Sequence, residues 1–394
     1  MDHILTKEET GLLDLLRASL TEEEHAADAM SAEELQSICR TAEKHSVLPL
    51  LQPVLEGTPA ASVCLTAAQS CAAQFYHLLI LNCRCVRLLE DAGIETVVLK
   101  GAGAAWYYPV PEHRRSGDID LLLARPDQMD EACRILTEDG AVPEEDQHAN
   151  HHMSLRTPEG IDVELHISIV EDFDSHAVNG HVARAARALS ENRILREIMP
   201  GAELPVPAEP DQAVSLMLHM LQHFLRAGFG LKLICDWAAL WSRMPEGTDL
   251  TRYEIFLDEC GLRGFSDMLG SVCVRYLGLD PEKACVRELF GDDECREFLR
   301  DIFDAGTFGH SSPSRMVMVR GGIFGYIREF HHQMHLNYPS AGKQIVLWPL
   351  LWVMTLGRFL RNNRRLRRTS LAQIMGETRR RSRAAEPLHL FEKY

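Results

Sequence analysis

Two aspartates stand one residue apart in a segment that otherwise reads as an apolar β-strand. The segment is RRSGDIDLLL, residues 114–123, and the aspartates are Asp118 and Asp120. Aspartate is disfavoured in strands, because its short side chain competes for backbone hydrogen bonds. Residues i and i+2 of a strand point to the same face, so the two carboxylates stand side by side while Ile119 and Leu121 face the core. Adjacent carboxylates repel unless a cation lies between them, and Mg²⁺, a hard cation with oxygen ligands, suits this spacing. Removing one of the two charges should leave stability unchanged or raised.

A second segment, IDVELHI at 161–167, supports this interpretation. Its apolar residues alternate strictly with Asp162, Glu164 and His166, which predicts a strand with an apolar back and a polar front. Paired with the first acidic strand, it could bring a third carboxylate to the cation. Asp162 and Glu164 share one face, so strand geometry alone does not choose between them.

A glycine turn precedes the aspartates. The segment LKGAG, residues 99–103, follows an expected strand over 94–100 and opens a short helix. Such turns let backbone N–H groups approach phosphate oxygens closely. Gly101 and Ala102 would form this cradle, and Lys100 and Arg114 could balance the charge of a triphosphate.

The elements that must position these residues follow from periodicity and capping signals. Residues 1 to about 90 carry apolar side chains at helical spacing, with a capping box at Ser31 and Glu34 and a helix over 73–93 that ends at Gly93. Residues 94–170 then form an α/β island. It holds strands at 94–100 and 118–124, a helix over 125–141, and a hairpin that turns at 158–160.

The segment PGAELPVPAEP, residues 200–210, reads as a proline-rich linker, and the chain beyond it is helical again. We therefore predict an α+β protein with a mixed-sheet core at 85–204. A helical region at 1–84 precedes this core. A helical domain with a basic tail follows it at 205–394.

Composition limits the class of protein. The chain has 394 residues, a formal net charge of −16 and 46% hydrophobic residues, which is ordinary for a folded soluble protein and unlike a general nucleic-acid coat protein. Its eleven cysteines are scattered through apolar helices without a Cys-x-x-Cys pair, as expected for reduced core residues.

The first residues are acidic and polar, unlike a signal peptide, and the segment 345–357 is too short to span a membrane and contains Pro349. These features indicate the cytoplasm.

The histidine clusters and the basic tail each allow more than one interpretation. His148, His151 and His152 lack a second ligand pair, so a polar loop is favoured over zinc. A solvated or partly buried helix is expected for the histidines at 331, 332 and 335, and a core or pocket-lining role for His219 and His223. The segments 357–370 and 377–383 are rich in arginine. Three interpretations stay open for this tail: a solvated helix, a surface for RNA, and attachment to a membrane surface beside two tryptophans.

Strand, glycine turn, helix, Asp-x-Asp strand and a later single acid together resemble the DNA polymerase β-type nucleotidyltransferase superfamily. Within it, LKG, YYP, RRSGDIDLLL and VELH resemble the family of uncharacterised nucleotidyltransferases, as do LMLHMLQHF, LICDWAALW and YPSAGKQIVLWPLLW further on. The resemblance covers roughly residues 30 to 370. It implies a nucleotidyltransferase-type sheet core.

The resemblance also implies roles. Asp118, Asp120 and Glu164, which stands two residues before a histidine, match the metal ligands. Gly101 matches the turn glycine, Ala102 stands where the wider superfamily usually has serine, and Arg114 matches an arginine before the aspartates. The implied activity uses two Mg²⁺ ions to transfer a nucleoside monophosphate from a nucleoside triphosphate to a hydroxyl, with release of pyrophosphate.

Two hypotheses follow. The first is a nucleotidyltransferase whose acceptor is a small molecule, a peptide or protein, or an RNA end. The second is a non-catalytic module that keeps the fold to bind nucleotide or a partner, for which the missing hydroxyl at Ala102 is the argument. Neither the base nor the acceptor nor the oligomeric state follows from the sequence.

Overall fold

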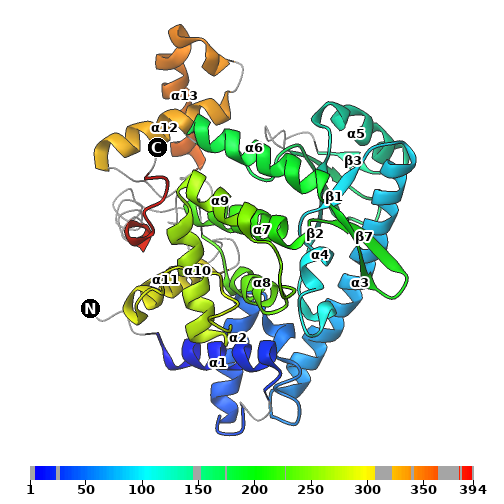
Figure 1. Ribbon diagram of the computed structural model, residues 1–394, viewed down its shortest axis with the longest axis vertical. Coiled ribbons are helices and arrows are strands. Elements are labelled where there is room, and N and C mark those ends of the chain that lie inside the picture. Colours follow the sequence, from blue (N-terminus) through cyan, green and yellow to red (C-terminus); the bar gives the residue numbers. More distant parts are fainter. Residues whose placement is uncertain are drawn as a thin grey trace.

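The computed structural model describes residues 5–23, 27–144, 152–173, 175–226, 228–306, 322–338, 341–362, 381 and 384–392. The structure contains a mixed sheet, and helical regions precede and follow it in the sequence (Figure 1). This arrangement confirms the predicted α+β class. The N-terminal region consists of α1 (Lys7–Thr21), α2 (Ala32–Lys44), η1 (Leu48–Leu51) and the long α3 (Ala61–Asp91). The predicted capping box is present at α2, where Ser31 and Glu34 cap each other's backbone N–H groups.

The core region follows the predicted order with additions. Its elements are β1 (Thr96–Val98), α4 (Ala102–Ala105), η2 (Pro111–His113), β2 (Asp118–Leu123), η3 (Pro126–Gln128), α5 (Met129–Glu138), β3 (Val142–Pro143), β4 (His152–Arg156), β5 (Asp162–His166), α6 (His176–Glu191), β6 (Ile194–Met199) and β7 (Ala202–Val206). The strands β1 to β5 form one sheet in the order β1-β2-β5-β4-β3, in which only the β2–β5 pair is parallel. The predicted hairpin is the β4–β5 pair.

The two faces of this sheet differ in chemistry. Ile119, Leu121, Val163 and Leu165 point into a buried cluster formed with α3 and α5, which cover that face. The alternate positions of β2 and β5 carry the acidic residues on the opposite face. The predicted period of two is therefore confirmed, and the apolar face buries the strands while the polar face stays available for chemistry.

The segment predicted as a proline-rich linker is a strand in its middle. Residues 202–206 form β7, which pairs with β6 in a separate antiparallel hairpin, and Leu204 and Val206 are buried beside β1 and α3. The linker prediction was wrong because Pro205 occupies one strand of a two-stranded ribbon, where a missing N–H is tolerated. The division into three regions stays a prediction, and its boundaries at 84 and 204 fall inside α3 and β7.

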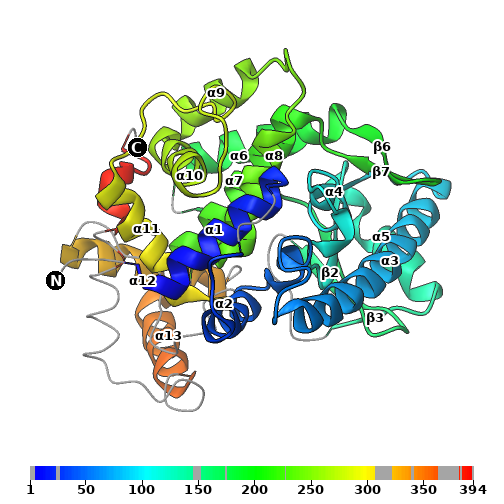
Figure 2. The same cartoon turned by 90° about the horizontal axis from the view of Figure 1, so that it is seen from below.

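The C-terminal region is helical. It consists of α7 (Glu209–Leu225), α8 (Leu231–Ser242), α9 (Thr251–Cys260), α10 (Arg263–Tyr276), α11 (Asp292–Ala305), α12 (Gly322–Asn337), η5 (Ala341–Lys343), η6 (Ile345–Leu347), α13 (Trp348–Asn362) and η8 (Glu386–Leu388). Figure 2 shows α1 crossing beneath α7 and α8, and residues of all three share one apolar core with Trp237 and Trp241 at its centre. All eleven cysteines are free and mostly buried, as predicted.

The chain end returns to this helical domain. Arg381 is fully buried, donates to the backbone carbonyls of Phe224 and Arg226, and lies 3.4 Å from Asp301. Leu388 and Phe391 join the core, and a Cβ at Gly264 would stand only 2.4 Å from the Leu388 carbonyl oxygen. A docked segment therefore follows the arginine-rich stretch in the sequence. Residues 363–380 of that stretch lie outside the described part of the chain.

Among the described residues, α3 alone is long and apolar enough to cross a membrane by length and composition. The helix also has eleven buried residues, from Cys64 to Leu89, and eight of them belong to the two apolar clusters of the core. A core helix meets the same criteria, so its apolar character has a packing explanation.

Candidate active site

The register of β2 and β5 brings the predicted carboxylates together. In this parallel pair Asp120 lies opposite Glu164 and Asp118 lies opposite Asp162. Asp118, Asp120 and Glu164 thus occupy neighbouring positions on the polar face of two central strands. Three oxygen-bearing side chains on one rigid surface are the donor set that Mg²⁺ prefers.

Asp120 is the most deeply buried of the three, with 1% of its side chain exposed. Its Oδ1 accepts hydrogen bonds from Lys100 Nζ at 2.8 Å and from His166 Nε2 at 3.1 Å. Burial alone would raise the pKa of Asp120, but these two donors hold it well below its usual range. Asp118 is half-buried, and the charge of Asp120 together with burial raises its pKa.

The second oxygen of Asp120 tests the fit of a cation. Oδ2 is buried and has no hydrogen-bond partner among the described residues. A buried carboxylate oxygen without a partner costs free energy unless something binds it. The residues on this face therefore suit a divalent cation, for which Asp118, Asp120 and Glu164 would be the ligands.

Glu164 and Asp162 differ in what they contact. Asp162 forms an ion pair with Arg156 at 2.8 Å, across the hairpin. Glu164 lies 3.3 Å from His166, and hydrogen bonding to this histidine lowers its pKa. Glu164 thus belongs to the charged cluster around Asp120, whereas Asp162 lies at the start of β5 and pairs with Arg156 of β4.

Two histidines belong to this cluster. His166 is buried and lies beside both carboxylates, and His152 lies directly opposite it on β4, with ring centroids 5.2 Å apart. Candidate ligand atoms of His152, Glu164 and His166 lie within 4.8 Å of one another. The loop predicted for His152 was wrong, because the residue starts β4. His148 and His151 lie outside the described residues.

The predicted glycine turn is present and adopts a backbone conformation that requires glycine. Gly101 has φ +58° and ψ −119°, a combination essentially restricted to glycine, and α4 begins directly after it at Ala102. Lys100 comes just before the turn. Burial opposes the charge of Lys100, but Asp120 and Asp118 outweigh it and raise its pKa, so the ammonium stays charged beside the carboxylates.

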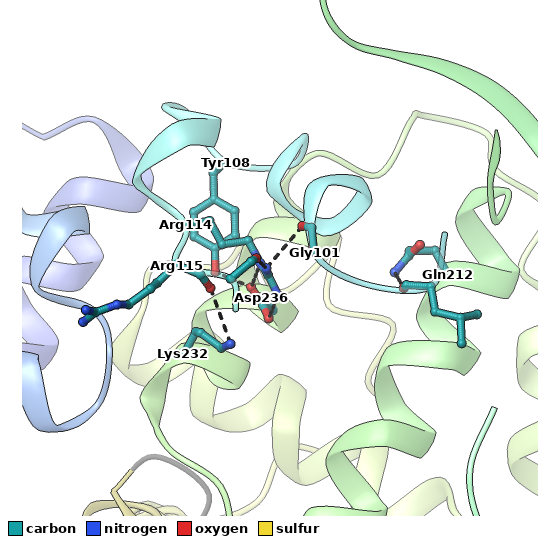
Figure 3. Close-up of polar contacts among 9 residues, drawn as sticks. Gly101, Tyr108, Arg114, Arg115, Gln212, Lys232 and Asp236 are labelled. Carbon is teal, nitrogen blue, oxygen red and sulfur yellow. Dashed lines mark hydrogen bonds and ion pairs between the residues drawn. The ribbon is translucent and has the colours of Figure 1, made fainter. Parts of the chain in front are cut away.

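Arg114 faces the helical domain instead of standing open beside the turn (Figure 3). Its Nε and Nη2 each donate to Asp236 of α8 at 2.7 Å, and Nη1 donates to Ser116 and, at 3.2 Å, to the Gly101 carbonyl. Tyr108 donates a third bond to Asp236 at 2.6 Å. Arg114 thereby connects the turn to α8, and its contacts within the chain are those of a residue that positions the turn.

The helix α8 brings a further charged group to the site that the sequence argument did not assign. Lys232, one helical turn before Asp236, donates to the Arg115 carbonyl at 3.4 Å, as Figure 3 shows. Burial and the charge of Arg114 lower its pKa to about 8, and Asp118 is among the charges that act on it.

His219 and His223 of α7 stack edge to face, with ring centroids 4.5 Å apart. Burial and the nearby charge of Lys100 lower the pKa of His223 to about 4 and that of His219 well below its usual value. Both imidazoles are thus neutral at pH 7, close to the charged cluster. The side chains of His219 and His223 are half-buried and lie near Lys100, which fits the pocket-lining role expected of these two histidines.

A sequence signal for Lys232 and Asp236 did exist. In LKLICDWAALW they are two charged residues four positions apart in an otherwise apolar helix. Such residues share one helix face, and a buried charge requires a partner. The signal predicts a polar contact but does not name Arg114, which lies 122 residues earlier in the chain.

Comparison with known proteins agrees with this geometry. A family model described as an uncharacterised nucleotidyltransferase matches residues 31–278, and no curated protein matches the chain. The matched region runs from the start of α2 to the end of α10, so it contains the sheet and the α7 and α8 residues of the site. It spans well over half of the sequence. The chain therefore belongs to the uncharacterised nucleotidyltransferase family.

Proposed function

We propose that the protein is a Mg²⁺-dependent nucleotidyltransferase that transfers a nucleoside monophosphate from a nucleoside triphosphate to an acceptor hydroxyl. The acceptor oxygen forms a bond to the α-phosphorus, the bond from this phosphorus to the bridging oxygen breaks, pyrophosphate leaves, and the hydroxyl proton passes to water. The observation that carries the proposal is the row of Asp118, Asp120 and Glu164, with the Asp120 oxygen that has no partner among the described residues.

Bound Mg²⁺ would neutralise phosphate charge and activate the acceptor oxygen. The protein's own groups supply placement. Lys100 pairs with Asp120 and the charge of Lys232 acts on Asp118, while Arg114 connects the glycine turn to α8. Most of the catalysis is then orientation and charge neutralisation on rigid elements.

The role of the third acid is tested by a matched pair of variants on one strand. Glu164→Gln is expected to lower turnover by at least about a hundredfold, because a metal-ligand contact contributes several kcal/mol to the transition state. Asp162→Asn removes only a half-exposed ion pair with Arg156 and is expected to change turnover less than about threefold.

The assay follows triphosphates labelled at the α-phosphate, each of the four bases in turn, with and without Mg²⁺, and detects both pyrophosphate and labelled product. The reverse ranking of the two variants would move the third-acid role to Asp162. Mg²⁺-dependent binding of triphosphate in calorimetry, without release of pyrophosphate under any condition, would instead support the non-catalytic module, which the missing hydroxyl at Ala102 favours.

Lys232 predicts a pH dependence. Its pKa of about 8 means that the ammonium loses its charge as the pH rises through this value. kcat/KM for the triphosphate reports the free enzyme and is therefore expected to fall above about pH 8. Lys232→Met should lower kcat/KM below pH 8 and flatten this limb, while Lys283→Met, a lysine bound to the Ser242 carbonyl in the helical domain, should leave the profile unchanged. An unchanged alkaline limb in Lys232→Met would remove this lysine from the nucleotide site.

A further inference from the structure

The short η6 and the helix α13 that follows it together present an apolar face to solvent. Val346 is 91% exposed, and Ile345 and Val353 are each 68% exposed. Seven of the sixteen exposed large apolar side chains of the described residues lie in this short segment, and together they define the α13 surface: Ile345, Val346, Leu350, Trp352, Val353, Met354 and Leu356. A contiguous exposed apolar patch of this kind indicates an interaction site.

Only the inward side of α13 packs against the rest of the described residues. Leu351 and Thr355, one turn apart, are buried, and Trp352 contacts Phe330 of α12. Val346, Leu350, Val353 and Met354 follow the three- and four-residue spacing of a single outward stripe. Figures 1 and 2 both show α12 and α13 at the margin of the molecule, away from the sheet.

Charge identifies the partner. The chain as a whole is acidic, with a net charge of −16, yet residues 357–370 contain six arginines and no acidic residue. Arg358 and Arg361, the first two of these, are exposed at the end of α13. An apolar stripe with tryptophan beside it and arginine at its end is typical of helices that lie in the boundary between lipid head groups and acyl chains.

We propose that the α13 surface binds an anionic membrane, with its apolar side chains in the acyl boundary and its arginines at the phosphate groups. The apolar segment 345–358 is too short to span a bilayer, so the helix would lie in the surface. A second copy of the chain fits less well, since residues 345–370 contain no acidic side chain that could pair with the arginines of the other copy. RNA would leave the aliphatic side chains without a partner, because single-stranded RNA is bound by aromatic stacking and charge.

Co-sedimentation of the full chain with vesicles tests the proposal. We expect binding to vesicles of phosphatidylcholine mixed with phosphatidylglycerol, and weaker binding to phosphatidylcholine alone. Leu350→Ser combined with Val353→Ser should weaken binding at least about tenfold, because two aliphatic side chains lose their apolar environment. Ile80→Ser on α3 is the matched control, since Ile80 is also 68% exposed, and it should bind like the wild type.

The charge contribution is separable. Arg358→Gln and Arg361→Gln should each weaken binding to the anionic vesicles about fivefold, whereas Arg125→Gln, an exposed arginine near the sheet, should not. Melting curves check that every variant is folded.

Equal vesicle binding by wild type and by the Leu350 and Val353 double variant overturns the proposal. So does lipid-free self-association that the double variant abolishes, or binding of an RNA oligonucleotide without binding of vesicles. Because vesicle binding needs no nucleotide, its outcome is independent of the proposed nucleotidyl transfer.

Discussion

Replacing Asp120 with asparagine is expected to lower nucleotidyl transfer by at least about a thousandfold, because it removes the charge of the central carboxylate among the three proposed metal ligands. The amide oxygen keeps the shape of the side chain but is a poorer ligand for a hard cation. Release of pyrophosphate and transfer of the α-phosphate label to product measure the loss. Calorimetric titration with Mg²⁺ alone should show weaker binding, which separates a lost ligand from a misplaced substrate.

The same substitution should lower stability at neutral pH. The sequence argument expected stability to hold or rise, since one of two repelling charges is removed. In the structure, however, Lys100 and His166 hold the pKa of Asp120 well below its usual range. A carboxyl group with a lowered folded-state pKa stabilises the fold above its unfolded pKa, and this contribution is lost as the pH falls below about 4. The difference in melting temperature between wild type and Asp120→Asn should therefore shrink toward acid pH.

Asp118→Asn is the matched control, because its stability effect should have the opposite sign. The charge of Asp120 and burial raise the pKa of Asp118, so its ionised form costs stability at neutral pH. This variant should also lose transfer but should melt at an unchanged or higher temperature. Parallel destabilisation by both substitutions would contradict the charge arrangement described for the site.

Asp236→Ala is expected to cost about 3–5 kcal/mol of unfolding free energy, since it leaves the buried guanidinium of Arg114 without its counter-charge. Both side chains are at most 4% exposed, and Asp236 accepts two bonds from Arg114 and one from Tyr108. Urea unfolding measures the loss. Affinity for the triphosphate should fall as well, because Arg114 also holds the carbonyl of Gly101.

A neighbouring aspartate provides the comparison. Asp211 of α7 is buried too, but its partner Arg252 is 47% exposed, so Asp211→Ala should cost less than about 1 kcal/mol. Combining Arg114→Met with Asp236→Leu should recover much of the stability, since an apolar pair can replace a buried ion pair. It should not recover nucleotide affinity, because the turn remains unsupported. Recovery of both would show that the pair has no positioning role.

The polar face of the sheet was predictable because it depends on local rules. Strand periodicity places Asp118 beside Asp120 and puts Glu164 on the polar side of its own strand, whatever the rest of the chain does. The fold class followed from the same alternation and from helical spacing on both sides of it. The register that sets Asp120 opposite Glu164 also required the pairing of two strands, and a polar face that must meet another polar face restricts that pairing strongly.

The remaining features depend on contacts between distant segments. Asp236 can be recognised as a buried charge, but its partner Arg114 is chosen by the docking of α8, which no local pattern describes. The lowered pKa of Asp120 depends in the same way on where Lys100 and His166 end. The β6–β7 hairpin was missed because its prolines suggested a linker, whereas Leu204 and Val206 are held in place by the apolar face of the core.

The docked segment around Arg381 limits where the arginines that follow α13 can lie. Residues 363–380 are tethered at both sides, by α13 at one end and by the buried Arg381 at the other. A chain spans at most about 3.6 Å per residue, so no arginine in this stretch can lie farther than about 35 Å from one of its two anchors. The covalent connection to both anchors therefore limits how far these arginines can lie from the helical domain. Any surface that seats α13 would meet these arginines at no further cost in translational entropy.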